Sequence, residues 1–120
     1  MASTHTLRTI QAAATTHTAG AGLATGTAVD ITTKYGGVLT AKITNGSGTL
    51  GVPATLSVMV SGDNTNWKTF AVVTHSVTST AVGEWAFDIP MGVMYVNVTL
   101  GGNTTVDVTW EAFLQELTTI

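Results

Sequence analysis

The stretch TVDVTWEAFL, residues 105–114, decides the fold class, because apolar and polar residues alternate through it without a break. A period of two places successive side chains on opposite faces of a β-strand. The pattern therefore predicts a strand with one face on a core and the other in solvent. The expected core face carries Val106, Val108, Trp110, Ala112 and Leu114, and the solvent face carries Thr105, Asp107, Thr109 and Glu111.

Outward from this stretch, the same alternation recurs in five segments between residues 27 and 100. The stretch WKTFAVV, residues 67–73, does not fit, because Trp67 and Phe70 fall on opposite faces. A β-bulge there, or a loop role for Trp67, would explain the mismatch. We expect both Trp85 and Trp110 to be largely buried. The other residues expected in the core are Val29, Ile31, Leu39, Ala41, Ile43, Leu56, Val58, Val60, Phe87, Ile89, Met94, Val96, Val98 and Leu100.

The connections between these segments contain Gly, Asn or Pro, as in KYGG, NGSG, SGDN, IPMG and GGN. These residue types favour the backbone conformations that reverse a chain. About seven strands with frequent turns predict an all-β protein, an antiparallel β-sandwich. The pattern leaves jelly-roll and Ig-like connectivity equally open.

Residues 1–26 differ from the rest, being rich in Ala, Thr and Gly. Beyond Met1, their large apolar residues are Leu7, Ile10 and Leu23. We therefore expect an extended N-terminal arm without a core over 1–26 and a β-sandwich domain over 27–120. A short helix around RTIQAAA is the local alternative.

Three buried side chains would contribute roughly 5–9 kcal/mol, less than the cost of ordering the backbone of such an arm. We therefore expect the arm to need backbone pairing with a strand edge, or threading across a neighbouring subunit. The hypothesis is that it tethers the sandwich to a partner through Leu7, Ile10 and Leu23.

The composition excludes several function classes. The chain has no Cys, four basic residues, a net charge of −3 and only 9% charged residues. Nucleic-acid binding requires clustered cations, so we expect no nucleic-acid partner. No apolar run approaches the roughly 18 residues of a membrane span, so we expect no membrane partner either. A surface so poor in charge suits a subunit of an assembly.

The stretch VSGDNTNWKTF, residues 60–70, offers a carboxylate, two Asn and a Trp. A calcium site would need more carboxylates, and a sugar site would use Trp67 as a stacking platform. The simpler interpretation is a turn in which Asp63 and Asn64 bond the local backbone. We expect this turn, with its tip at Asp63 and Asn64 contacting a partner.

Catalytic, cofactor and metal sites are not expected. His5, His17 and His75 are dispersed, whereas zinc requires three or four convergent ligands. A triad can be written from Ser57 or Ser76 with His75 and Asp88, but no nucleophile elbow accompanies it. We therefore expect a protein that is not an enzyme.

Three longer stretches carry a resemblance: VDITTKYGGVLTAKITNGSG, PATLSVMVSGDNTNWKTF and FDIPMGVMYVNVTLGGNTTVDVTWEAF. Together they resemble small β-sandwich structural proteins of tailed bacteriophage virions, over about residues 27–115. The resemblance implies a capsid cement or decoration protein with a jelly-roll-like body and an extended arm. Its motifs are strands and turns, so it implies no catalytic residue.

Such a protein would form a homo-oligomer, a dimer or a trimer, and bind the major capsid protein. The resemblance places it on the capsid surface of the virion, after assembly in the cytoplasm of the host bacterium. A phage tail, fibre or vertex component is the alternative within this class. A carbohydrate-binding module is the alternative outside it, and would require two or three aromatic side chains on one exposed face.

Overall fold

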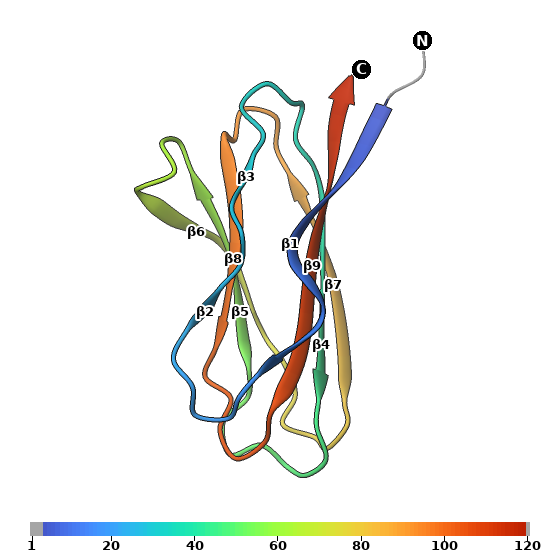
Figure 1. Ribbon diagram of the computed structural model, residues 1–120, viewed down its shortest axis with the longest axis vertical. Coiled ribbons are helices and arrows are strands. Elements are labelled where there is room, and N and C mark those ends of the chain that lie inside the picture. Colours follow the sequence, from blue (N-terminus) through green and yellow to red (C-terminus); the bar gives the residue numbers. More distant parts are fainter. Residues whose placement is uncertain (1–3, 120) are drawn as a thin grey trace.

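The computed structural model describes residues 4–119, which form nine β-strands in two antiparallel sheets (Figure 1). No helix that could span a membrane occurs in this range. The strands are β1 (Thr4–His17), β2 (Ala24–Thr25), β3 (Val29–Asp30), β4 (Gly37–Asn45), β5 (Thr55–Ser61), β6 (Trp67–Thr74), β7 (Val82–Ile89), β8 (Tyr95–Gly101) and β9 (Val108–Thr119).

The strand order identifies a jelly roll. One sheet, the first sheet, has the order β1-β9-β4-β7, and the second sheet has the order β2-β8-β5-β6. Strand β3 also pairs with β8, so β2 and β3 act as two halves of one interrupted strand. Except between β5 and β6, each connection carries the chain from one sheet to the other. Eight strand positions wound in this way make a jelly roll rather than an Ig-like sandwich.

The predicted core faces are largely confirmed. Trp110 is 2% exposed, and its neighbours on the same face of β9 are also buried. Trp85 packs against the core but stays partly exposed, because β7 lies at a sheet edge. The prediction that Met94 lies in the core is wrong. Its side chain is 42% exposed, because it precedes the first residue of β8.

The prediction of a coreless arm is also wrong for the N-terminal residues that the structure describes. Strand β1 pairs antiparallel with β9 from Thr4↔Thr119 to His17↔Val108. Ile10 is 2% exposed and belongs to the core. The pairing with β9 overrides the helix propensity of the Ala-rich stretch, so the helix considered for residues 8–14 is not formed. The β-sandwich therefore begins at β1 and not at residue 27.

The ambiguous stretch on β6 contains the expected bulge. Val58 of β5 lies opposite Ala71 and the next residue, Met59, lies opposite Thr69, so Phe70 is the extra residue. An extra residue reverses the facing of the chain on its two sides and bends the strand. Trp67 is the first residue of β6, so the bulge and not a loop role for Trp67 explains the mismatch.

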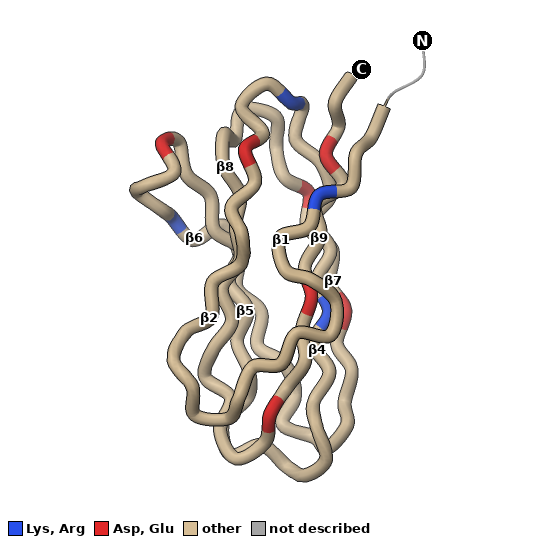
Figure 2. The backbone as a smooth tube through the Cα atoms, viewed as in Figure 1, with Lys and Arg blue, Asp and Glu red and all other residues tan. Residues whose placement is uncertain are grey.

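The two long sides of the sandwich are built differently. On the closed side, which comprises β1, β2 and β3, the N–H of Thr27 donates to the carbonyl of Ile10 (2.8 Å). The N–H of the adjacent Gly26 donates to the carbonyl of Val98 in the second sheet (2.9 Å), so this segment links the two sheets. On the open side, which comprises β6 and β7, each strand ends its sheet with one paired neighbour. Charged residues are few on either side (Figure 2).

Candidate interaction surface

Two of the three apolar residues expected to contact a partner remain available on the surface. Leu7 on β1 is 66% exposed, and Leu23, just before β2, is 69% exposed. Ile10 is not available, because its side chain fills the core between the sheets. The hypothesis of a tether reaching away from the sandwich is therefore wrong for residues 4–26, and Leu7 and Leu23 remain as isolated surface contacts.

The loop that contains Asp63 and Asn64 is a self-contained turn. One carboxylate oxygen of Asp63 accepts the backbone N–H groups of Asn66 (2.7 Å) and Thr65 (2.9 Å). The side-chain amide of Asn66 donates to the other oxygen (2.7 Å), and the Ser61 hydroxyl also donates to Asp63 (3.0 Å). These donors, the Asn66 backbone first, hold the pKa of Asp63 well below its usual range. Asn64 adopts a positive φ of 59° at the exposed tip.

This geometry favours the turn over a metal site, because the oxygens of Asp63 already accept hydrogen bonds from their own loop. Among residues 4–119, no group of three or more His, Cys, Asp or Glu side chains is placed to hold a metal ion. Asp63 and Asn64 are both exposed, and their contact with a partner stays a prediction.

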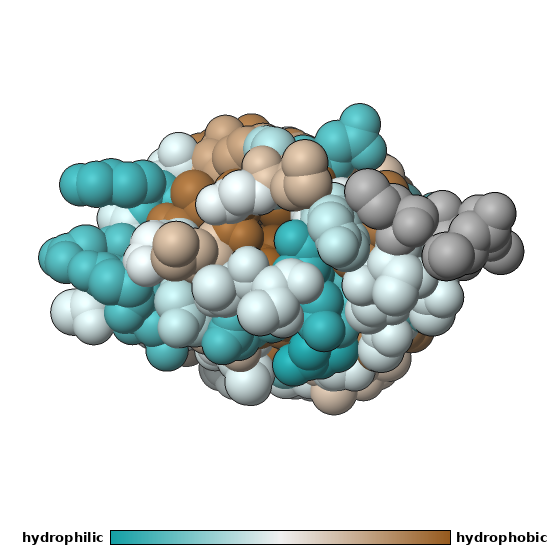
Figure 3. Space-filling view, turned by 90° about the horizontal axis from the view of Figure 1, so that it is seen from above, coloured by the Kyte–Doolittle hydropathy of each residue, from teal (hydrophilic) through white to brown (hydrophobic). Residues whose placement is uncertain are grey.

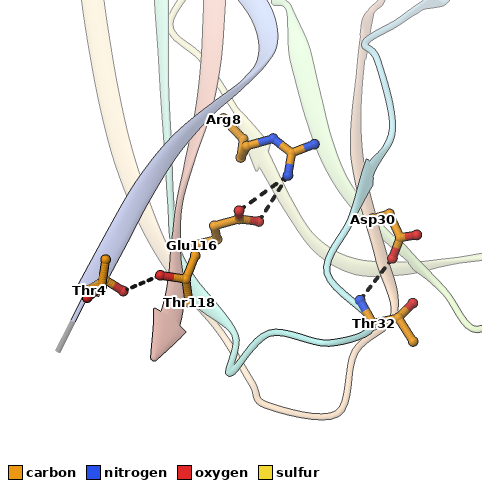
Figure 4. A network of polar contacts seen from close by, with 6 residues as sticks. All are labelled: Thr4, Arg8, Asp30, Thr32, Glu116 and Thr118. Atoms are coloured by element: carbon orange, nitrogen blue, oxygen red, sulfur yellow. Dashed lines mark hydrogen bonds and ion pairs between the residues drawn. The ribbon is translucent and has the colours of Figure 1, made fainter. Parts of the chain in front are cut away.

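An ion pair lies between β1 and β9 near the end of the sandwich where β9 finishes (Figure 4). The Arg8 guanidinium donates to both carboxylate oxygens of Glu116 at 3.3 Å. The Glu116 side chain is only 4% exposed, whereas that of Arg8 is 41% exposed. The sequence signal for Glu116 was its place on the inner face of β9, two residues beyond Leu114.

Asp30 on β3 belongs to the same region (Figure 4). Its carboxylate accepts the backbone N–H of Thr32 at 2.9 Å. That bond, and after it the side chain of Thr32, lowers the pKa of Asp30, and the positive charge of Arg8 lowers it further. Glu116 is therefore paired within the first sheet and Asp30 within its own segment, and neither carboxylate is free of a hydrogen bond.

A buried polar pair joins β1 to the loop after β8. His17, 4% exposed, places one ring nitrogen 2.5 Å from the side-chain oxygen of Asn103 and the other 2.8 Å from the carbonyl of Gly22. The amide of Asn103 donates to the carbonyls of His17 and Val106, both at 3.2 Å. These bonds replace backbone pairing where the chain turns, and sequence pattern could not show them, because the partners are 86 residues apart.

The Ser and His side chains considered for a catalytic triad do not hydrogen-bond to each other. The ring of His75 faces the carbonyl of Ala81 (3.1 Å) and lies edge-on to Trp85 at 5.5 Å. The hydroxyl of Ser76 donates to Thr78 instead. His75 therefore packs the turn between β6 and β7.

A shallow groove of about 440 Å³ lies on the outer face of the first sheet. Lys42 on β4 stands directly opposite Glu84 on β7 and Glu111 on β9, and Phe113 borders the same groove. Opposite charges on neighbouring strands stabilise a sheet modestly. Trp85 also lines the groove, but its side chain packs against the core, so the groove does not present the two or three exposed aromatic rings that a sugar-binding face requires.

An open hollow of about 450 Å³ lies between the Asp63 loop and residues 92–94. Seen from this end, apolar side chains gather around a hollow of the surface (Figure 3). Val60, Val93 and Met94 supply its apolar part, and Lys68 stands at its edge.

The open side carries the exposed apolar residues of two adjacent edge strands. Phe70 and Val72 on β6 are 41% and 54% exposed, and Val82 on β7 is 56% exposed. Trp85 and Phe87 lie on the inner face of β7 and are only partly covered. Unpaired backbone and exposed apolar side chains on one side are the features of an assembly surface.

No protein-family model matches the chain, and no curated protein sequence is similar to it. Solved structures do match its fold. A subunit of Bacillus endospore appendages, described as disulfide-linked pili, has a TM-score of 0.57 at 15% identity, over 100% of this chain and 93% of that one. The VP2 subviral particle of infectious bursal disease virus gives a TM-score of 0.59 at 8% identity, over 98% of this chain and 33% of that one.

A third match is the K3 cleaved adhesin domain of Lys-gingipain from Porphyromonas gingivalis. Its TM-score is 0.52 at 12% identity, over 78% of this chain and 62% of that one. Identities this low show the shared β-sandwich fold alone. The chain spans nearly the whole pilus subunit but only about a third of the viral chain. Because the chain has no Cys, it cannot form disulfide links like those of the Bacillus pili.

Proposed function

We propose that the protein is a non-enzymatic structural subunit of a bacteriophage virion, a cement or decoration protein bound to the outer capsid shell. The observation that carries the proposal is a jelly roll in which the buried side-chain polar atoms of the described residues, Asn45 Oδ1 excepted, have hydrogen-bond partners, while apolar residues stand exposed on its sides. Exposed apolar residues of this kind suit contact with another protein, whereas hydrogen-bonded buried polar groups are not free to bind a small substrate.

Two further points support this role. Viral particles and pili both include chains of this fold, and in both the fold serves as a repeated building unit. The low charge of the chain also reduces the cost of burying its surface against a shell. The proposed partners are other copies of the chain and the major capsid protein, and the proposed location is the virion surface.

The direct test is mass spectrometry of purified virions, with the copy number of the protein measured per particle. Many copies per particle would support decoration of the capsid, whereas a few copies would indicate the alternative, a tail, fibre or vertex component. Absence from the virion would overturn the proposal.

A second test concerns Leu7 and Leu23 as contacts to the shell. Purified protein is added to shells that lack it and sedimented with them. We expect Leu7→Ser and Leu23→Ser to weaken co-sedimentation without altering the circular dichroism spectrum. Val52→Ser, at another exposed apolar site, is the matched control and should bind like the parent. Unchanged binding of both Leu variants would remove these residues from the contact surface.

A further inference from the structure

The open side presents two free sheet edges. Strand β7 pairs regularly with β4 over its whole length, Val82–Ile89, and contains neither Pro nor Lys. Pro, Lys and bulges are the usual protections of an edge against a further strand. Strand β1 does have such protection, since its register shifts twice between Thr9 and Thr15 and the carbonyl of Ile10 is already taken by Thr27.

The backbone of β7 offers a definite set of groups to an added strand. Just beyond its start, the N–H of Asn45 donates to the carbonyl of Ala81 (2.9 Å), in register with the β4–β7 ladder. In an antiparallel ladder, bonding residues alternate between the two neighbours. The residues whose N–H and carbonyl groups point to the free edge are therefore Val82, Glu84, Ala86 and Asp88.

The same argument applies to the second half of β6. The N–H of His75 donates to the carbonyl of Ala54 (2.9 Å), in register with the β5–β6 ladder. Val72 and Thr74 therefore point their backbone groups to the free edge of β6. These two residues and the free set on β7 also carry outward-facing, exposed side chains.

The two free edges fit one another in one antiparallel register. In this register, Val72 of one copy lies opposite Glu84 of a second copy, and Thr74 lies opposite Val82. In both pairs the free backbone groups of the two strands point at each other, and the side chains lie on the outer face of the joined sheet. The same register sets Ala71 opposite Trp85 on the inner face. A small residue opposite a large one packs without collision, as cross-strand pairs require.

Charge favours pairing of β7 with β6 over pairing of β7 with itself. Two β7 strands would bring Glu84 and Asp88 of both copies onto one face, four carboxylates in all, and facing like charges destabilise a sheet. Strand β6, with the sequence WKTFAVVT, has no acidic residue and carries Lys68.

We propose that the open side binds a second copy of this chain, with β6 of each copy added to β7 of the other. A twofold axis parallel to the strands produces both pairings at once, because β6 ends and β7 begins at the same end of the sandwich. The pairing extends both sheets and covers Val72 and Val82. This dimer is one form of the self-association that the proposed structural role includes. The inference rests on the proposed function to that extent only.

The first experiment measures the mass of the purified full chain by size-exclusion chromatography with light scattering, over a concentration series. The parent protein should reach the mass of two chains. Glu84→Pro removes the N–H that faces Val72 of the other copy, at an edge position where Pro is tolerated, and should raise the dimer dissociation constant at least about tenfold. Glu84→Thr loses the same charge but keeps that N–H, and should dimerise like the parent.

A parent protein that stays monomeric at all concentrations would overturn the proposal. So would equal dimerisation of the Pro and Thr variants. Val72→Pro makes the same test on β6 if Glu84→Pro fails to fold. A monomeric protein that still binds virions would overturn this interface and leave the proposed function standing.

The register is tested by cross-linking, which the absence of Cys makes clean. Directly opposite Cα atoms in a hydrogen-bonded pair are about 5.5 Å apart, within disulfide range. Val72→Cys with Glu84→Cys should therefore give a covalent dimer on oxidation, whereas Val72→Cys with Asp88→Cys should not. Within one chain these residues face outward from opposite sheets and cannot join. Equal cross-linking of both pairs, or a ladder of larger species, would overturn the twofold arrangement.

Discussion

The two long sides of this sandwich differ in how the edge strands of the two sheets are connected. On the closed side, the carbonyl of Ile10 in the first sheet accepts the N–H of Thr27, next to the residue that bonds the second sheet. On the open side, no backbone hydrogen bond joins β6 to β7 in the described chain, and the link there is a side chain, His75, which contacts the carbonyl of Ala81 and packs on Trp85. The closed side is therefore joined through its backbone, whereas the edges of the open side keep the free groups on which the proposed dimer rests.

The largest expected effect distinguishes the two sides by core burial. Ile10→Ala removes a side chain that is 2% exposed on the closed side, and should lower the free energy of unfolding by about 2–5 kcal/mol. Val82→Ala, at a site 56% exposed on the open side, should change it by less than about 0.5 kcal/mol. Urea denaturation at low protein concentration measures both. Equal losses would show that the sides do not differ in this way.

A smaller effect tests the link between the sheets. A Cβ added to Gly26 would lie 2.7 Å from the Ile10 side chain and 2.9 Å from its carbonyl oxygen. We expect Gly26→Ala to cost about 1–3 kcal/mol, since the two segments must move apart.

Gly22→Ala is the matched control, because a Cβ at Gly22 meets nothing within 4 Å. It should leave the urea midpoint nearly unchanged. If Gly26→Ala is as mild as Gly22→Ala, the close approach of β1 to the second sheet is not important for stability.

The smallest effect concerns the turn that leads into β6. The folded-state pKa of Asp63 is lowered by the N–H donors of its loop. The stabilisation from these bonds is therefore complete above the unfolded pKa, near 4, and is lost as the pH falls below it. Asp63→Asn should be less stable than the parent at pH 7, and the difference should shrink towards pH 2.

Asp88→Asn removes one carboxylate from β7 without touching the loop, and so controls for net charge. Urea denaturation of the three proteins at several pH values measures the difference. A gap between Asp63→Asn and the parent that stays constant with pH would contradict the assignment of the loop bonds.

Sequence alternation predicted the central strands well, because β4, β8 and β9 bury one face completely. Leu39, Val98 and Trp110 face the core as expected. At the edges the signal was weaker. Trp85 faces the core but is partly exposed, since no strand covers the free edge of β7.

The N-terminal residues could not be predicted because their stability comes from distant partners. Strand β1 contributes one large buried apolar residue, Ile10, and is otherwise held by its ladder to β9 and by polar pairs such as Arg8 with Glu116 and His17 with Asn103. Counting apolar residues therefore underestimated it. Connectivity was equally hidden, because which strand lies next to which depends on long-range register.

The candidate surface was predicted in part. Local pattern identified Asp63 as a turn residue, which its hydrogen bonds confirm. Contact of Leu7 and Leu23 with a partner stays a prediction, and both are exposed in the single chain. The open side was missed, because a free edge is a property of the assembled sheets. Nothing in the sequence around Val72 or Ala86 indicates that these residues lie at a free sheet edge.

Residue-resolved hydrogen exchange at low and high protein concentration tests the division between the two sides most directly. We predict that the amides of Val72, Val82 and Glu84 on the open side gain protection as concentration rises. The amide of Thr27 on the closed side, bonded within the chain, should be protected equally at both concentrations. Protection that rises at the closed side, or open-side amides that exchange equally fast at both concentrations, would contradict the account.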